Sequence, residues 1–414
     1  MTWRLLQRYS RRMLLAGIVL LISARTSEAQ EFFDAVDDHL KFSAFNQGVV
    51  GKISGLIDLE EYYVQQPPPG VIYDDHSLLF NPRLTLNLDV QIGPQLYLFA
   101  QGRFDRGFDP NSEGAAQVRA DQYALRYTPW EDGRFNIQVG KSATVVGSWA
   151  LRDDSWQNPF VTAPLPYENL TGVWDAVAAP SGSTLTSWAG ADKSLRIPII
   201  WEGAYSTGAS VFGSLGKFDY AADFKNAALS ARPESWSATS VGFSNPSFSG
   251  RLGYRPNEAW NLGVSSSVGT YLMPSASDTL APGQSLSDYK EILIAQDASF
   301  AWHHLQIWAE CFETRFEVPT VGNADTLAYY IEAKYKFSPS FFAALRWNQQ
   351  LFNTVPNGTG GDAAWGSDID RIDAAVTYRF SPHLQAKLQY SYLDQGSPIR
   401  TDQSFAAAQV TLQF

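Results

Sequence analysis

The chain has 414 residues, a net charge of −11 at pH 7 and a mean hydropathy of −0.20. It is too polar for a bundle of membrane-spanning helices and, with 45% hydrophobic residues, too apolar for a disordered chain. The negative charge argues against a nucleic-acid partner, and the single cysteine excludes an internal disulfide framework. The five histidines have no metal-ligand spacing, so neither a metal nor another cofactor is predicted.

The first 29 residues predict a secretory signal peptide. Four arginines between positions 4 and 12 precede an apolar run at 13–22, and Ser27-Glu28-Ala29 offers the small residues that a signal peptidase reads. The pair Arg11-Arg12 also fits a twin-arginine motif, which leaves the export route open. Residues 30–47 are expected to form a periplasmic lead-in. The mature chain has no apolar run of the about 18 residues that suggest a spanning helix.

The mature chain alternates apolar and polar residues with the period of a β-strand. At 83–92 every second residue is Leu, Val or Ile, and the residues between them are polar. The same pattern recurs at 327–337, 369–380 and 383–394. These runs are about ten residues long, which suits a tilted strand across a bilayer better than the roughly five or six residues usual in soluble sheets.

Short turns and long loops also alternate along the chain. Seven short turns interleave with eight longer loops, at 62–80, 107–117, 146–204, 230–246, 271–288, 317–326, 353–368 and 395–404. This pattern predicts an all-β fold, a transmembrane antiparallel barrel over residues 48–414 with about 16 strands. Eighteen strands stay possible, because the stretch 195–247 has room for another hairpin. An even strand number places both termini on the periplasmic side.

The last alternating run, 405–414, ends its apolar face with Phe414. This run resembles the terminal strand of Gram-negative outer-membrane proteins, in which a final Phe is recognised by the barrel-assembly machinery. The resemblance implies that Phe414 is an assembly signal. It also implies that outer-membrane lipid and the assembly machinery are partners of the chain.

The whole mature chain resembles a Gram-negative outer-membrane porin. Two segments, 135–141 and 208–226, are similar to parts of the phosphate-selective porin superfamily. Phosphate-binding members of that superfamily carry dense basic residues at the constriction. The loop 146–204 holds three basic residues beside six acidic ones, which argues against phosphate selectivity.

The third long loop, 146–204, is the candidate constriction. In porins the loop at this position, between strands five and six, folds into the lumen and narrows the pore, so the resemblance implies the same role here. Indoles next to carboxylates suit contacts with sugars, with Trp156 or Trp174 stacking on the ring. The alternative is that the aromatic residues only pack the loop. The candidate residues are Trp149, Arg152, Asp153, Asp154, Trp156, Tyr167, Glu168, Trp174 and Asp175.

The alternation also predicts which charged residues of the strands face the lumen. The basic candidates are Arg83, Arg103, Arg126, Lys334, Lys336, Arg346, Arg371, Arg379 and Lys387. Such a wall is slightly basic and favours small anions, unless most of these charges pair with acidic neighbours and cancel.

These features predict a water-filled outer-membrane channel for small hydrophilic solutes, either sugars or small anions. A homotrimer is left open, and no enzyme is predicted, because no catalytic motif accompanies the histidines or serines. The alternative function is a plugged or structural barrel that acts as an adhesin, an anchor or an outer-membrane enzyme.

Overall fold

The computed structural model describes residues 27–106, 116–190, 192–233, 242–396 and 401–414. The predicted signal peptide lies almost entirely outside the described residues. None of the helices in the described ranges combines the length and the apolarity that a membrane-spanning helix needs.

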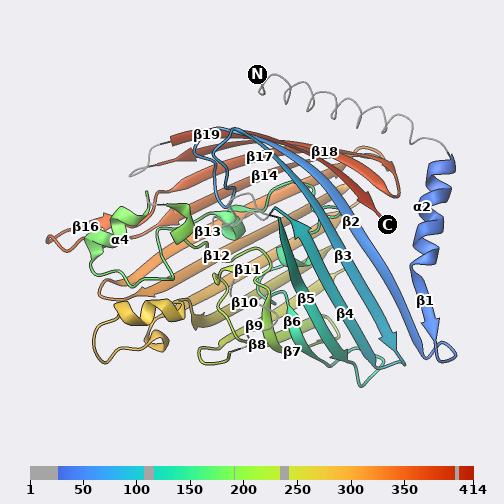
Figure 1. Ribbon diagram of the computed structural model, residues 1–414, viewed down its shortest axis with the longest axis horizontal. Coiled ribbons are helices and arrows are strands. Elements are labelled where there is room, and N and C mark those ends of the chain that lie inside the picture. The colour runs from blue at the N-terminus through green and yellow to red at the C-terminus, as the bar shows by residue number, and fades with distance from the viewer. Residues whose placement is uncertain (1–26, 107–115, 191, 234–241, 397–400) are drawn as a thin grey trace.

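Sixteen antiparallel strands form a closed barrel (Figure 1), in which each strand pairs with its neighbours in sequence and β19 pairs with β2. This result confirms the predicted all-β fold and the count of 16, and the stretch 195–247 adds no further hairpin in its described part. The barrel strands are β2 (Val49–Val64), β3 (Leu78–Ile92), β4 (Leu96–Asp105), β5 (Gln117–Tyr127), β6 (Asn136–Ser142), β7 (Ser206–Leu215), β8 (Phe218–Lys225), β9 (Ser247–Asn257), β10 (Trp260–Thr270), β11 (Lys290–Trp302), β12 (Leu305–Val318), β13 (Gly322–Lys336), β14 (Phe341–Phe352), β17 (Ile369–Ser381), β18 (Leu384–Gln395) and β19 (Thr401–Gln413).

One predicted loop, 317–326, is wrong. Strand β12 continues to Val318 and β13 begins at Gly322, so only three residues connect them. Positive φ angles at Thr320 (64°) and Gly322 (108°) reverse the chain within this short turn. The polar composition of 317–326 favours a loop, but most of its polar residues belong to the ends of the two strands. The loop after β14 contains a small hairpin of β15 (Thr354–Pro356) and β16 (Asp362–Ala364).

The two faces of the barrel wall differ in chemistry. Leu388 of β18 is 61% exposed, whereas the next residue, Gln389, is 3% exposed. The Gln389 amide oxygen accepts hydrogen bonds from the backbone N–H groups of Val161 (2.6 Å) and Thr162 (3.2 Å). Exposed apolar residues on the outer face and polar residues on the inner face are the pattern of a barrel that crosses a lipid bilayer.

The N-terminal segment packs against the end of the barrel where the short turns lie. Helix α2 (Ser27–His39) leads into β1 (Lys41–Ala44), which pairs with β2 at residues 49–52, beyond the end of β19. The ring of Phe33 stacks on His383, and the Asp34 carboxylate lies 3.0 Å from Nε2 of the same histidine. The assignment of residues 30–47 to the periplasm stays a prediction.

Deleting Phe414 is expected to lower strongly the amount of folded barrel in the outer membrane. Phe414 exchanges two backbone hydrogen bonds with Gly55 of β2 (2.9 and 3.1 Å), and its ring covers the position where a Gly55 Cβ would lie. The residue therefore completes the pairing that closes the barrel. Heat-modifiable migration of membrane fractions measures this effect, and Phe337→Ala, at an exposed phenylalanine away from the barrel closure, is the control. An unchanged folded fraction would contradict the assigned role.

Candidate functional site

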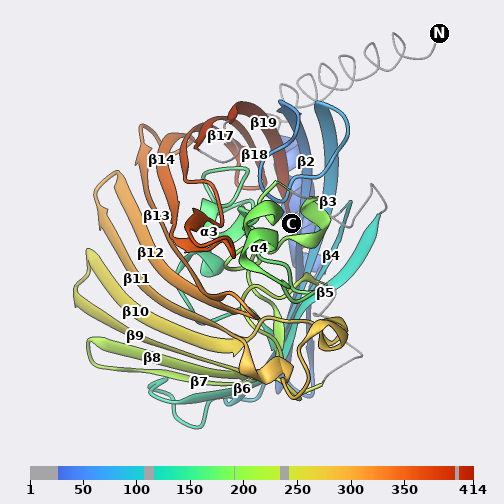
Figure 2. The ribbon, with the colours of Figure 1, turned by 90° about the vertical axis from the view of Figure 1, so that its left-hand side faces the viewer.

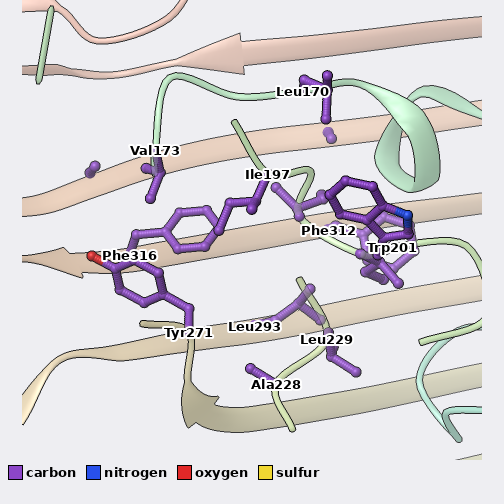
Figure 3. Packing of buried hydrophobic residues seen from close by; sticks show 14 of the residues in the cluster. Leu170, Val173, Ile197, Trp201, Ala228, Leu229, Tyr271, Leu293, Phe312 and Phe316 are labelled. Atoms are coloured by element: carbon purple, nitrogen blue, oxygen red, sulfur yellow. The ribbon is translucent and has the colours of Figure 1, made fainter. Parts of the chain in front are cut away.

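The connection 143–205, which joins β6 to β7, carries the candidate site. It contains the short helices α3 (Leu165–Glu168) and α4 (Gly182–Trp188), and Figure 2 shows both within the outline of the ring of strands. Its side chains Ile197 and Trp201 belong to one buried apolar cluster with Phe312 and Phe316 of β12 (Figure 3). Burial of this apolar surface holds the connection against the barrel wall.

Glu310 of β12 binds the start of the connection. One carboxylate oxygen accepts hydrogen bonds from the Ser148 hydroxyl (2.9 Å), the Trp149 N–H (3.0 Å) and the Ser148 N–H. The other oxygen accepts a hydrogen bond from the Tyr167 hydroxyl at 2.7 Å. Gly147 has a φ of 72°, and a Cβ there would lie 2.9 Å from Glu310, so glycine is required at this approach. The candidates Trp149 and Tyr167 are therefore part of an anchor.

A second anchor joins the helix α3 to β14 and β17. Arg371 donates hydrogen bonds to Glu168, to Asp373 (3.2 Å) and to the carbonyl oxygen of Ala163 (2.6 Å). Arg346 donates to Asp373 at 2.8 Å and to the Ala163 carbonyl at 3.0 Å. All four charged side chains are buried. The candidates Glu168, Arg346 and Arg371 thus neutralise one another's charges and fix the position of the connection.

A third anchor holds the residues that follow the first turn of the connection. The Arg152 guanidinium donates hydrogen bonds to Glu332 (2.7 Å) and to the Tyr330 hydroxyl (3.0 Å), and lies 4.5 Å from the ring centre of Trp308. Two neighbouring strands, β12 and β13, therefore hold this arginine. Leu151 beside it is 78% exposed. Arg152 therefore fixes the position of the first residues of segment 151–157, which is called the edge of the connection below.

Along this edge the candidate Trp156 is half-buried and lies next to the cation of Arg379. The guanidinium of Arg379 is 4.9 Å from the indole centre and donates a hydrogen bond to the Trp156 carbonyl oxygen (3.1 Å). Asp154 accepts hydrogen bonds from the backbone N–H groups of Trp156 (2.9 Å) and Gln157 (2.8 Å). Asp154 therefore shapes the turn that presents the indole.

The candidates Trp174 and Asp175 lie in a different environment. The indole of Trp174 stacks on Trp188 with ring centres 4.0 Å apart and planes 6° from parallel. Asp175 is buried and accepts two hydrogen bonds from Arg232 (2.9 and 2.8 Å). One face of Trp174 is thus covered by another indole, although Trp174, like Trp156, is only partly buried.

The candidate cations of the strands fall into two groups. Arg83 pairs with Asp58 and Glu60, and Arg103 pairs with Asp105 and Glu202, as Arg346 and Arg371 pair with the carboxylates named above. For the other group, the described residues place no carboxylate within 4.0 Å of the cation. This group consists of Arg126, Lys334, Lys336, Arg379 and Lys387.

Asp153 is expected to make ion preference depend on pH near neutrality. Burial raises the pKa of the Asp153 carboxyl to about 7, against the hydrogen bond from the Tyr205 hydroxyl (2.8 Å) and the charge of Arg103, both of which lower it. The nearby carboxylates of Asp154 and Glu202 raise it further. The group is therefore negative above pH 7 and neutral below, and the cation-to-anion permeability ratio should fall by the effect of about one charge between pH 8 and pH 6.

Reversal potentials in a salt gradient measure this ratio. Asp153→Asn is expected to remove the pH-dependent step. A step of equal size in the variant would show that another group titrates.

The anchoring role of three residues escapes reasoning from the sequence: Glu310, Tyr330 and Glu332. Their alternation places all of them on the inner face, as the structure shows. Their partners in the connection lie more than 140 positions away in the chain. Only a long-range contact identifies them, and a single sequence contains no signal for it.

Comparisons with known proteins identify the fold. No protein-family model matches the chain, and no curated protein matches it. Among solved structures it is similar to OmpF of Salmonella typhi in a complex with daunomycin (TM-score 0.56, 15% identity, 90% of this chain and 100% of that one). It is also similar to an anion-selective porin from Comamonas acidovorans (0.56, 12%, 88% and 100%) and to the outer-membrane channel DcaP of Acinetobacter baumannii (0.57, 12%, 90% and 99%). The chain therefore has a porin-like β-barrel fold.

Proposed function

We propose that the protein is a porin, a water-filled channel through which small hydrophilic solutes diffuse across the outer membrane. One observation supports this proposal above the others. The inner face of β3–β5 borders an open hollow of about 480 Å³ at the short-turn end of the barrel, lined by Asp89, Gln91, Pro94, Gln95, Tyr97, Phe99, Gln122, Arg126 and Thr128. A hollow with a largely polar lining on the inner face is typical of a barrel that contains water.

In this proposal the connection 143–205 lies in the lumen and sets its width. Its anchors Glu310, Glu332 and Arg371 are all inner-face residues of the wall. Its edge 151–157 keeps Asp153, Asp154 and Trp156 only partly buried. Solutes therefore pass between this edge and the wall, where fixed charges act strongly because the surrounding lipid and protein have a low dielectric constant.

Purified protein in a planar lipid bilayer tests the proposal. We expect discrete current steps whose size rises with salt concentration, from protein whose heat-modifiable migration shows a folded barrel. Folded protein that produces no steps would refute the channel and leave a closed barrel.

A closed structural barrel is the second candidate. The observation in its favour is the dense set of contacts by which connection 143–205 buries inner-face residues such as Arg346, Arg371 and Lys387. The same bilayer measurement separates the two functions, since a plugged barrel that anchors, adheres or catalyses needs no ion conduction.

A further inference from the structure

We propose that Lys334, Lys336, Arg379 and Trp156 form a binding site for small organic carboxylates that carry an apolar ring. This inference rests on the proposed channel function and names the class of solute that the channel selects. The four residues come from β13, β17 and the edge 151–157 of the connection.

The register of three strands brings the cations together around one aromatic ring. Lys336 of β13 lies opposite Phe342 of β14, and Phe342 lies opposite Thr377 of β17, two residues before Arg379. The Lys334 ammonium is 4.4 Å from the centre of the Phe342 ring, and the Arg379 guanidinium is 5.6 Å from it. Cations and aromatic rings therefore alternate from Lys334 through Phe342 and Arg379 to Trp156.

Lys334 is a mostly buried cation to which the described residues supply no carboxylate partner. Its side chain belongs to a residue that is only 7% exposed, and no carboxylate of the described chain lies within 4.0 Å of its ammonium. The Phe342 ring compensates only part of the lost hydration. By contrast, Arg346 and Arg371, which are more deeply buried at 1% exposure each, have carboxylates at hydrogen-bond distance. An anion beside Lys334 would supply the missing partner.

The Asp154 carboxylate of the connection does not take this place. Asp154 attracts Arg379 and Lys387 electrostatically, but one of its oxygens is engaged by two backbone N–H groups of its own turn. The cluster of Lys334, Lys336 and Arg379 thus keeps an excess of positive charge. Asp154 also repels a second negative charge on a ligand, which favours monoanions.

The partly exposed indole of Trp156 favours a ligand that carries an apolar ring in addition to its carboxylate. A compact inorganic anion would contact only the cations, whereas a carboxylate on an apolar ring would also cover the exposed part of the indole. The carboxylate accepts charge-assisted hydrogen bonds from Lys334, Lys336 or Arg379, and the ring gains apolar contact with Trp156. Only an amphipathic anion contacts both the cations and the indole. Benzoate is a simple probe of this class.

Isothermal titration calorimetry of the detergent-purified barrel measures the site directly. We expect benzoate to bind more tightly than acetate or inorganic phosphate, and neutral benzamide not to bind. Lys334→Met should weaken benzoate about tenfold or more, because a hydrogen bond to a charged group is worth at least that factor. Trp156→Leu should reduce the preference for benzoate over acetate. Asp154→Asn should tighten binding, and Arg134→Met, which removes an exposed cation of the β5–β6 turn, should leave it unchanged.

Two results would overturn the inference. Benzoate that binds no more tightly than acetate, or equally well to wild type and Lys334→Met, means that the cluster is not its site. Phosphate that binds more tightly than benzoate, with no effect of Trp156→Leu, means a site for inorganic anions. Conductance without benzoate is recorded in parallel. A conducting barrel that does not bind benzoate refutes only this site, whereas a folded barrel that does not conduct refutes the channel function.

Discussion

Replacing residues 152–176 by a short glycine-serine linker is expected to raise single-channel conductance severalfold and to abolish any solute preference. The replaced segment contains Asp153, Asp154 and Trp156, which form the exposed edge of the connection, and the anchoring residues Arg152 and Glu168. In the proposed channel this segment forms the narrowest section, and the narrowest section of a pore dominates its resistance, so its removal has the largest effect. Single-channel recordings in symmetric and graded salt measure both quantities.

A shorter external loop provides the matched control for this deletion. Residues 281–284, in the connection between β10 and β11, are exposed, and their removal should leave conductance unchanged. If the 152–176 replacement also leaves conductance and ion preference unchanged in a folded barrel, the connection lies outside the conducting path and the constriction proposal is refuted.

Glu310→Ala is expected to detach the start of the connection and to produce an unsteady channel. The substitution leaves the N–H groups of Ser148 and Trp149 and the Tyr167 hydroxyl without their acceptor. A buried donor left without a partner costs about 1–3 kcal/mol, and more than one donor is affected here. The outer wall of the barrel is untouched, so the barrel should still fold.

Limited proteolysis of the connection and the noise of open-channel current measure this loosening. Glu310→Gln is the matched control, because its amide oxygen still accepts hydrogen bonds from the two backbone N–H groups. We expect the glutamine variant to stay close to wild type. Equal protease resistance and equally steady currents in Glu310→Ala would show that the apolar cluster around Phe312 and Trp201 holds the connection by itself.

The barrel itself could be predicted from the sequence because its rules are local. Side chains alternate between two faces at every second residue, and lipid on one side and water on the other make that alternation visible as a pattern of residue types. Leu388 and Gln389 are on the predicted faces, and the count of 16 strands is correct. The error at 317–326 has the same origin, since polar residues at a strand end resemble a loop when only composition is read.

Which charges remain available to a solute was decided by the tertiary structure alone. Arg371 and Lys334 are both inner-face cations in the sequence, yet Arg371 meets Glu168, 203 positions away, while no carboxylate in the described part of the chain lies within 4.0 Å of Lys334. Trp156 and Trp174 are likewise equivalent candidates until Trp188 is found stacked on one of them. The periodicity of a strand indicates whether a side chain points to the inner or the outer face of the barrel. The energy of a buried charge depends on what lies within a few ångströms of it, and these neighbours come from distant parts of the chain.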